Sequence, residues 1–195
     1  MDYNKWYDNY IKDINIDNIE WINLNNKELN IFYKENYYDN NSNSYIYDKK
    51  MYTNSNKYVP IGMHYIEFDT LPGTKYLLGI CNNNINKKTI LACLNYTEDY
   101  ILFADQKNPI TYFSTIETNT YFRGLGLSKK LIYNSYNYIK QNQNILISDL
   151  SELGRKTNML DMTINILNSL DFNMDIRSDT DNFNKEEYHK LVKRK

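Results

Sequence analysis

The sequence predicts a mixed α/β domain of the α+β kind, and three observations lead to this fold class. Apolar and β-branched runs separated by turn residues fill much of the chain between residues 62 and 118, as is typical of antiparallel strands. After Gly124 and Gly126 the apolar residues take the spacing of an amphipathic helix. A further apolar run and a second helical pattern follow, so helices and strands alternate only in the last third of the chain.

The N-terminal part, residues 1–60, is polar and rich in Asn and Tyr. One early amphipathic helix is predicted there by five residues at helical spacing, namely Trp6, Tyr7, Tyr10, Ile11 and Ile14. Clusters of Asn and Ser predict loops at 40–44 and 53–56. We expect residues 1–60 to form a polar extension or helical cap of the same domain, rather than a second domain, with the main domain over 61–195.

A meander of strands is predicted from residue 63 onward. Residues 63–68 alternate loosely between apolar and polar side chains. The apolar runs 76–81 and 89–94 flank a polar segment, which is the pattern of a hairpin. Two more strands are expected at 100–104 and 110–118, and β-branched and aromatic residues indicate that the second is largely buried.

Two helices and three short strands are predicted for the rest of the chain. The first helix starts after Gly126 and ends at Asn142, and residues that form its apolar face recur at helical spacing as far as Tyr138. The second extends over residues 156–170, with Met and Ile on its apolar face. Strands are expected at 145–150, 173–177 and 187–192.

Composition and charge exclude several classes of partner. The 195 residues carry a net charge of −1, so no basic excess indicates a nucleic acid or an anionic membrane. No apolar run is long enough to span a bilayer, and the first residues lack the pattern of a signal peptide. The two cysteines, Cys81 and Cys93, have no metal-ligand spacing, so we expect reduced thiols, a cytoplasmic protein and no metal.

Scarce residue types gather in one short segment, Arg123 to Gly126. The chain has six glycines, of which Gly124 and Gly126 are two, and Arg123 is its first arginine. They lie between a predicted strand and a predicted helix, where unpaired N–H groups and the helix dipole favour an anion. Because glycine permits positive φ and a close approach of the backbone, this segment predicts a phosphate or pyrophosphate site.

Two other phosphate-binding motifs and a purely structural role for the glycines are the alternatives. A P-loop needs Gly-Lys-Ser/Thr at its end, which is absent. A dinucleotide-binding fold needs a third glycine where Lys129 stands, although Asp149 at the end of the next strand fits that motif. Few residues follow Leu150, too few to complete a doubly wound sheet. The glycines could also serve a tight turn alone, with Arg123 at the surface.

The segment resembles the GNAT superfamily of acyl-CoA N-acyltransferases. That family's signature, Gln/Arg-x-x-Gly-x-Gly/Ala, is supplied here by Arg123, Gly124, Leu125, Gly126, Leu127 and Ser128, with Ser in the last small-residue position. The resemblance covers residues 110–172 well and 76–109 loosely. It implies a mostly antiparallel central sheet, splayed between two central strands and flanked by helices.

The resemblance also implies how acetyl-CoA, as cosubstrate, would be held. The N–H groups of Leu125 to Ser128 would bind the pyrophosphate, and Arg123 and Lys129 would add positive charge. Pantetheine would lie along the strand end, Ile116 to Thr118, making strand-like bonds to the backbone. An N–H near Thr118 would then stabilise the oxyanion formed in acyl transfer.

A general base must take a proton from the amine. Glu117 is the first candidate, because it is acidic and close to the predicted thioester position, although strand alternation could direct it away. Asp149 and Glu152 are weaker candidates. His64 and His189 are more readily interpreted as ordinary surface or core residues.

The expected general acid is missing from its usual place. In the family a Tyr on the second helix often protonates the departing thiolate, five residues before a Gly-Phe or similar pair. Matching that pair to Asp171-Phe172 places Leu167 at the Tyr position. Either Tyr188 or water takes this role, or the helix is shifted, or the chemistry is degraded.

The function that these residues predict is an N-acetyltransferase, moving an acetyl or short acyl group from acyl-CoA to an amine by direct attack on the thioester. The alternatives are a catalytically degenerate CoA-binding module and a Rossmann-type nucleotide-binding domain. The acceptor could be a small molecule, a peptide or a protein amine. The sequence identifies neither the acceptor nor the oligomeric state.

Overall fold

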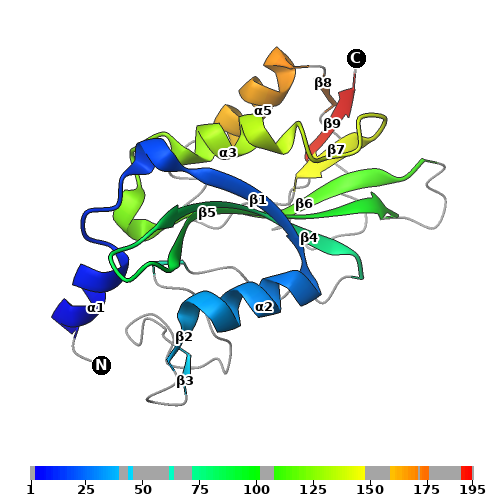
Figure 1. The fold of residues 1–195 in the computed structure, drawn as a ribbon. Helices are drawn as coiled ribbons and strands as arrows, with labels where there is room; N and C mark the ends of the chain where they lie inside the picture. The colour runs from blue at the N-terminus through cyan, green and yellow to red at the C-terminus, as the bar shows by residue number, and fades with distance from the viewer. Residues whose placement is uncertain are drawn as a thin grey trace, which may run out of the picture.

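A seven-stranded sheet forms the centre of the molecule (Figure 1). The computed structural model describes residues 3–39, 44–45, 62–63, 72–101, 108–147, 159–170, 172–175 and 190–194. The strand order is β1-β4-β5-β6-β7-β9-β8. These strands are β1 (Glu20–Asn25), β4 (Thr74–Asn82), β5 (Lys88–Tyr100), β6 (Ile110–Thr118), β7 (Asn144–Ile147), β8 (Phe172–Asp175) and β9 (Lys190–Arg194). A separate small pair joins β2 (Tyr38–Asp39) to β3 (Ser44–Tyr45).

Neighbouring strands of the large sheet are antiparallel except for β6 and β7, which are parallel. The parallel register is described from Ile110↔Asn144 to Phe113↔Ile147. The C-terminal half of β6, which carries the predicted site residues, extends past the last described residue of β7. A doubly wound parallel sheet is therefore excluded, and with it the Rossmann-type alternative.

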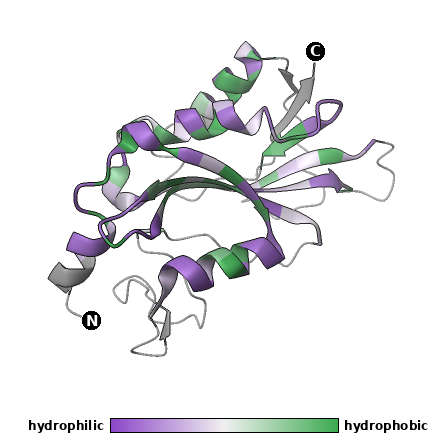
Figure 2. Ribbon diagram, in the orientation of Figure 1, coloured by the Kyte–Doolittle hydropathy of each residue, from purple (hydrophilic) through white to green (hydrophobic). Residues whose placement is uncertain are grey.

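Helices cover both faces of the sheet (Figure 1). The helix α2 (Asn26–Tyr37) lies on one face, and α3 (Leu127–Ser135) and α5 (Met159–Ser169) lie on the other. Hydrophilic and hydrophobic residues alternate along these helices (Figure 2), as expected when one side of a helix packs on a sheet. The architecture confirms the predicted fold class, a mixed α+β fold with a mostly antiparallel sheet between helices.

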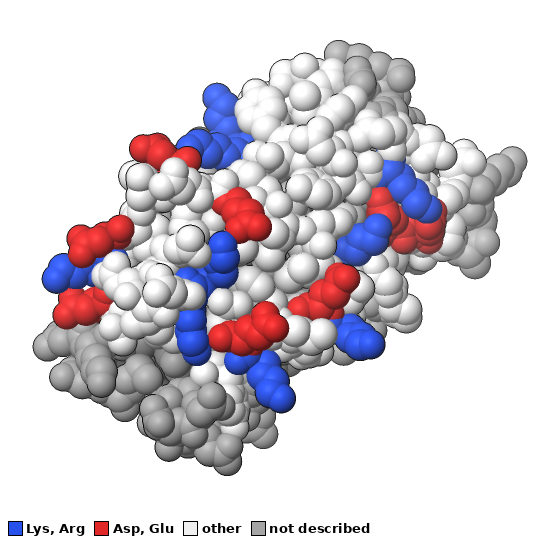
Figure 3. Space-filling view, in the orientation of Figure 1, with Lys and Arg blue, Asp and Glu red and all other residues white. Residues whose placement is uncertain are grey.

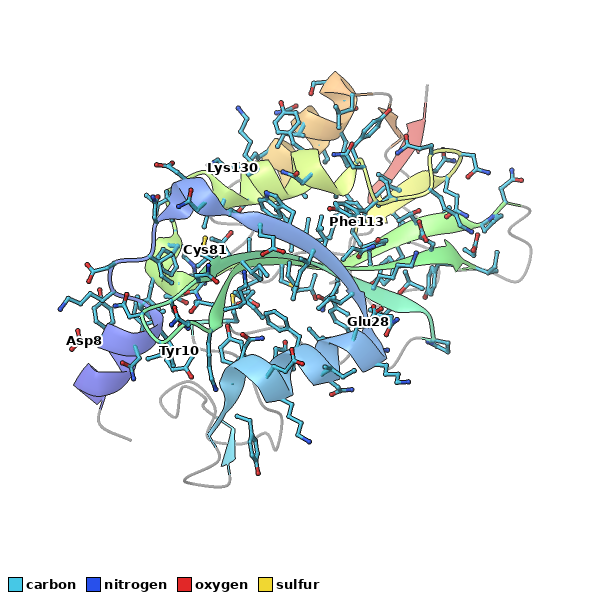
Figure 4. All side chains as sticks on the ribbon, in the orientation of Figure 1. Asp8, Tyr10, Glu28, Cys81, Phe113 and Lys130 are labelled. Carbon is cyan, nitrogen blue, oxygen red and sulfur yellow. The ribbon has the colours of Figure 1, made fainter. Side chains whose placement is uncertain are left out.

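The N-terminal part contributes more regular structure than the sequence analysis expected. The predicted first helix is α1 (Tyr3–Tyr10), followed by the short 3-10 helix η1 (Ile16–Asn18). Thr89 Oγ1 donates to the carbonyl of Tyr10 at 2.8 Å, and Figure 4 labels Tyr10 at the end of α1 beside the sheet. The next strand, β1, was not predicted, and it pairs with β4 over six residues.

The helix α2 was also missed, although its start has a readable signal. Asn25 accepts hydrogen bonds from the N–H groups of Lys27 and Glu28, and the Glu28 carboxylate accepts one from the N–H of Asn25. This is a capping box, with Asn in place of Ser or Thr. The spacing Asn25-x-x-Glu28 was therefore the local indication of a helix in the polar N-terminal segment.

Most predicted strand positions are confirmed, and one helix boundary was wrong. The strand predicted at 110–118 is β6, and the hairpin is β4 with β5, which continues to Tyr100. The first helix ends at Ser135 rather than Asn142. After Ser135 the chain continues in turns, in which the N–H groups of Tyr138 and Ile139 both donate to the Ser135 carbonyl, and the Tyr138 hydroxyl donates to the Trp21 carbonyl.

Several predictions lie partly or wholly outside the described residues. These are the strand at 63–68 beyond Met63, most of the strand at 100–104, and the ends of the elements predicted at 145–150, 156–170, 173–177 and 187–192. Over the part of the chain that is described, no helix is long and apolar enough to cross a membrane.

Candidate functional site

The turn between β6 and α3 has the backbone that the glycine pattern predicted. After the 3-10 helix η2 (Thr120–Phe122), Gly124 has φ +81°. Gly126 is the N-cap of α3, with φ +73° and ψ 14°, and no side chain caps the helix. The first hydrogen bond back to Gly126 comes from the N–H of Lys130. The N–H groups before Lys130 are therefore the helix-start donors that have no partner within the helix.

This turn is open to solvent and to ligands. Arg123, Gly124, Leu125 and Gly126 are all exposed, and the Leu125 side chain is 47% accessible. A Cβ atom built on Gly124 or on Gly126 would meet no heavy atom within 4 Å. The glycines therefore do not avoid a clash inside the protein. Their positive φ angles shape the backbone, and their missing side chains leave space outside it.

A side-chain contact holds the end of β6 against the start of α3. The hydroxyl oxygens of Thr118 and Ser128 lie 2.6 Å apart, within hydrogen-bond distance. Thr118 is nearly buried and faces α3 through this contact. Ser128, which replaces the usual Gly or Ala of the signature, thus contacts Thr118 through its hydroxyl. Its backbone N–H still lies in the first turn of α3.

Glu117, the residue before Thr118 in β6, faces the opposite side of the sheet. It pairs in register with Cys93, whose thiol donates to Asn95 Oδ1 at 3.0 Å. Asn95 pairs with Tyr76, and the Tyr76 hydroxyl donates to Asn26 Oδ1 of α2 at 2.7 Å. Paired residues share a face and so do residues two apart, so all of these side chains lie on the α2 side.

The Glu117 side chain is buried there among aromatic and thiol groups, being 5% exposed. Burial, and then the negative charges of neighbours that include Glu117, raises the pKa of Tyr33 on α2. Burial, and then the charge of Glu117, raises the pKa of the Cys93 thiol. A buried carboxylate is costly unless its environment compensates, which makes this position a candidate for chemistry rather than an exposed strand residue.

A groove adjoins the turn on the outer side of α3. It has a volume of about 530 Å³ and lies between α3 and α5. Its lining residues are Lys129, Tyr133, Asp161, Met162, Asn165, Ile166 and Ser169. Lys129 Nζ lies 5.9 Å from the centre of the Tyr133 ring, so a cation and an aromatic ring lie side by side in the wall of the groove. The groove itself could not be predicted from the sequence, because it forms only where two separate helices, α3 and α5, meet.

The remaining predicted site residues fall into two groups. Ile116 and Leu127 are buried beside the turn, and Leu167 is fully buried in the core on α5. The candidates Tyr188, Asp149, Glu152, His64 and His189 lie outside the described residues. Both cysteines are free and buried, as predicted.

Charges on the visible face are of mixed sign (Figure 3). Lys and Arg alternate with Asp and Glu across it, and several form ion pairs, such as Lys88 with Glu20 at 2.8 Å. In the described ranges of the chain, no group of three His, Cys, Asp or Glu side chains is placed to hold a metal ion.

Comparison with known proteins gives matches in structure only. No family model matches the chain, and no curated protein matches it in sequence. It is similar to a histone acetyltransferase HPA2 and related acetyltransferase from Corynebacterium glutamicum, at 16% identity and a TM-score of 0.38. That match covers 63% of this chain and 65% of the other, just under two thirds of its length. An integron cassette protein from the mobile metagenome of V. cholerae is similar at 16% identity and a TM-score of 0.41, covering 78% of this chain and 96% of that one.

Proposed function

We propose that this protein is a cytoplasmic N-acyltransferase that moves an acetyl or other short acyl group from acyl-CoA to an amine. One observation carries the proposal. An open glycine turn at the start of α3 comes a few residues after β6, whose last residues place a buried carboxylate, Glu117, on the other side of the sheet. An anion site and a candidate base are thus joined by a few residues of backbone.

The turn supplies the binding chemistry for the cofactor's pyrophosphate. The N–H groups from Leu125 to Ser128 are at or before the first turn of α3, where the helix dipole favours negative charge. Arg123 and Lys129 are exposed on either side of it. The groove with Lys129 and Tyr133 offers a cation and a ring to the nucleotide end of CoA.

In the proposed reaction the amine nitrogen attacks the thioester carbonyl carbon from the α2 side. Its proton passes to the Glu117 carboxylate, and a backbone N–H near Thr118 stabilises the oxyanion. The tetrahedral intermediate then collapses with cleavage of the C–S bond. The CoA thiolate takes a proton from Tyr188 or from water, since Leu167 has no proton to give and is buried in the core.

Binding and catalysis can be tested separately. Acetyl-CoA is expected to raise the melting temperature of the protein, and NAD is not, because a ligand that binds only the native state stabilises it. Release of CoA thiol in the presence of a panel of amines would then report acyl transfer. Stabilisation by acetyl-CoA without thiol release from any amine would instead identify a CoA-binding module.

The role of Glu117 has its own variant and control. Glu117→Gln keeps the shape of the side chain, so we expect acetyl-CoA binding to persist while kcat falls by about 10²–10⁴-fold, the usual contribution of general base catalysis. Glu20→Gln is the matched control, because Glu20 is a solvent-exposed carboxylate on β1. Full turnover by Glu117→Gln would place the base elsewhere.

A further inference from the structure

Gly62, in the chain between α2 and β4, is held tightly against the connection between β6 and α3. Its carbonyl accepts two hydrogen bonds from Thr120, one from the N–H at 2.8 Å and one from the hydroxyl at 2.9 Å. A Cβ atom on Gly62 would lie 2.1 Å from Asn119 Oδ1, and its φ of +77° also disfavours other residues. Only glycine therefore allows this contact without displacing Asn119.

Asn119 is itself a junction of several backbone segments. Its side chain is completely buried, and Nδ2 donates to the Ile90 carbonyl of β5 at 2.8 Å. Its N–H donates to the Leu91 carbonyl at 2.8 Å. Its Oδ1 accepts from the N–H of Tyr121 at 3.1 Å, which caps η2. Asn119 thus fixes the path of the chain where β6 ends and the turn begins.

The position of this junction connects it to the proposed chemistry. Asn119 comes two residues after Glu117 and four residues before Arg123. Met63, the residue after Gly62, is 1% exposed and belongs to the hydrophobic core. Its burial holds Gly62 in place, just as the hydrogen bonds of Asn119 hold Asn119 in place. Any shift of Asn119 would move the proposed base and the cofactor turn relative to each other.

We infer that Gly62 and Asn119 are positioning residues of the acyl-transfer site. Their contact fastens the segment of Gly62 and Met63 to the backbone that joins Glu117 to the cofactor turn, and so sets the geometry of that turn. The expected effect on acyl-CoA binding rests on the proposed acyltransferase activity. The expected effect on the backbone conformation of the turn does not depend on that activity.

The test uses the full chain, two single variants, their combination and a control. Gly62→Ala forces a Cβ atom into Asn119, and Asn119→Ala removes the group that it would strike. Gly73→Ala is the control, because Gly73 has a similar φ of +82° with nothing within 4 Å of its Cβ position. It therefore carries the same backbone strain without the contact. Two readouts are needed: acetyl-CoA affinity by calorimetry well below the melting temperature, and amide hydrogen exchange of residues 120–126.

We expect Gly62→Ala and Asn119→Ala each to weaken acetyl-CoA binding by about tenfold and to speed exchange over residues 120–126, with Gly73→Ala unchanged in both. The double variant should be no worse than Asn119→Ala, because the clash is then gone. A folded Gly62→Ala protein with native exchange in this segment overturns the inference. If the native protein binds no acyl-CoA, the proposed function fails, while the exchange data still decide whether the contact positions the turn.

Discussion

Replacing Gly126 by Val tests the cofactor turn most directly. Gly126 is the N-cap of α3 at φ +73°, a left-handed conformation that costs a residue with a Cβ atom roughly 1–2 kcal/mol. A Cβ atom at this position meets no heavy atom within 4 Å, so the backbone conformation is the main cost within the protein. We therefore expect a folded variant whose melting temperature falls by about 2–4 °C for each kcal/mol lost, as is usual for chains of this size.

The effect on binding should exceed the effect on stability. The two methyl groups of Val would occupy the space beside the N–H groups that the pyrophosphate needs, so acetyl-CoA affinity is expected to fall at least about tenfold, or ~1.4 kcal/mol, in calorimetry at 25 °C. Gly73→Val serves as the control, since Gly73 has φ +82° and an equally open Cβ position just before β4. It should lose stability but keep its affinity. Native affinity in a folded Gly126→Val protein would refute the assignment of this turn to the cofactor.

Three further predictions concern other parts of the molecule. Leu167→Tyr should destabilise the protein by about 1–3 kcal/mol in denaturant unfolding, because the added atoms overpack a fully buried position, and a gain in turnover would show that the phenol reaches the thiolate. Cys81 and Cys93 should resist alkylation until the chain unfolds, since burial raises the pKa of both thiols, and mass spectrometry should find no acetyl group on either during turnover. The hydrogen bond from Lys140, with one from Gln143, lowers the pKa of Asp99 below its usual value. The stability from that carboxylate is then present above a pH of about 4 and is lost on acidification, so Asp99→Asn should flatten the fall of melting temperature at acid pH.

Local chemistry makes the glycine turn between β6 and α3 predictable from the sequence. Positive φ at a helix start favours glycine whatever surrounds it, and a change from strand alternation to helical spacing can be read within a dozen residues. For this reason β6, the turn at Arg123 to Gly126 and the start of α3 were all placed correctly before the fold was known. The capping box at Asn25 and Glu28 was just as local, and it was missed because polar residues and Asn-rich composition obscured it.

Tertiary structure decided what local patterns leave open. Alternation along β6 shows that Glu117 and Thr118 face opposite sides, but only the pairing with β5 and the packing of α2 show which side is which. The chain after α3 likewise makes a long-range contact, because the Tyr138 hydroxyl donates to the Trp21 carbonyl of β1. The contact of Gly62 with Asn119 joins segments far apart in the chain, and no spacing rule can predict it. Such contacts are set by which surfaces meet when the core closes, and that depends on the whole chain at once.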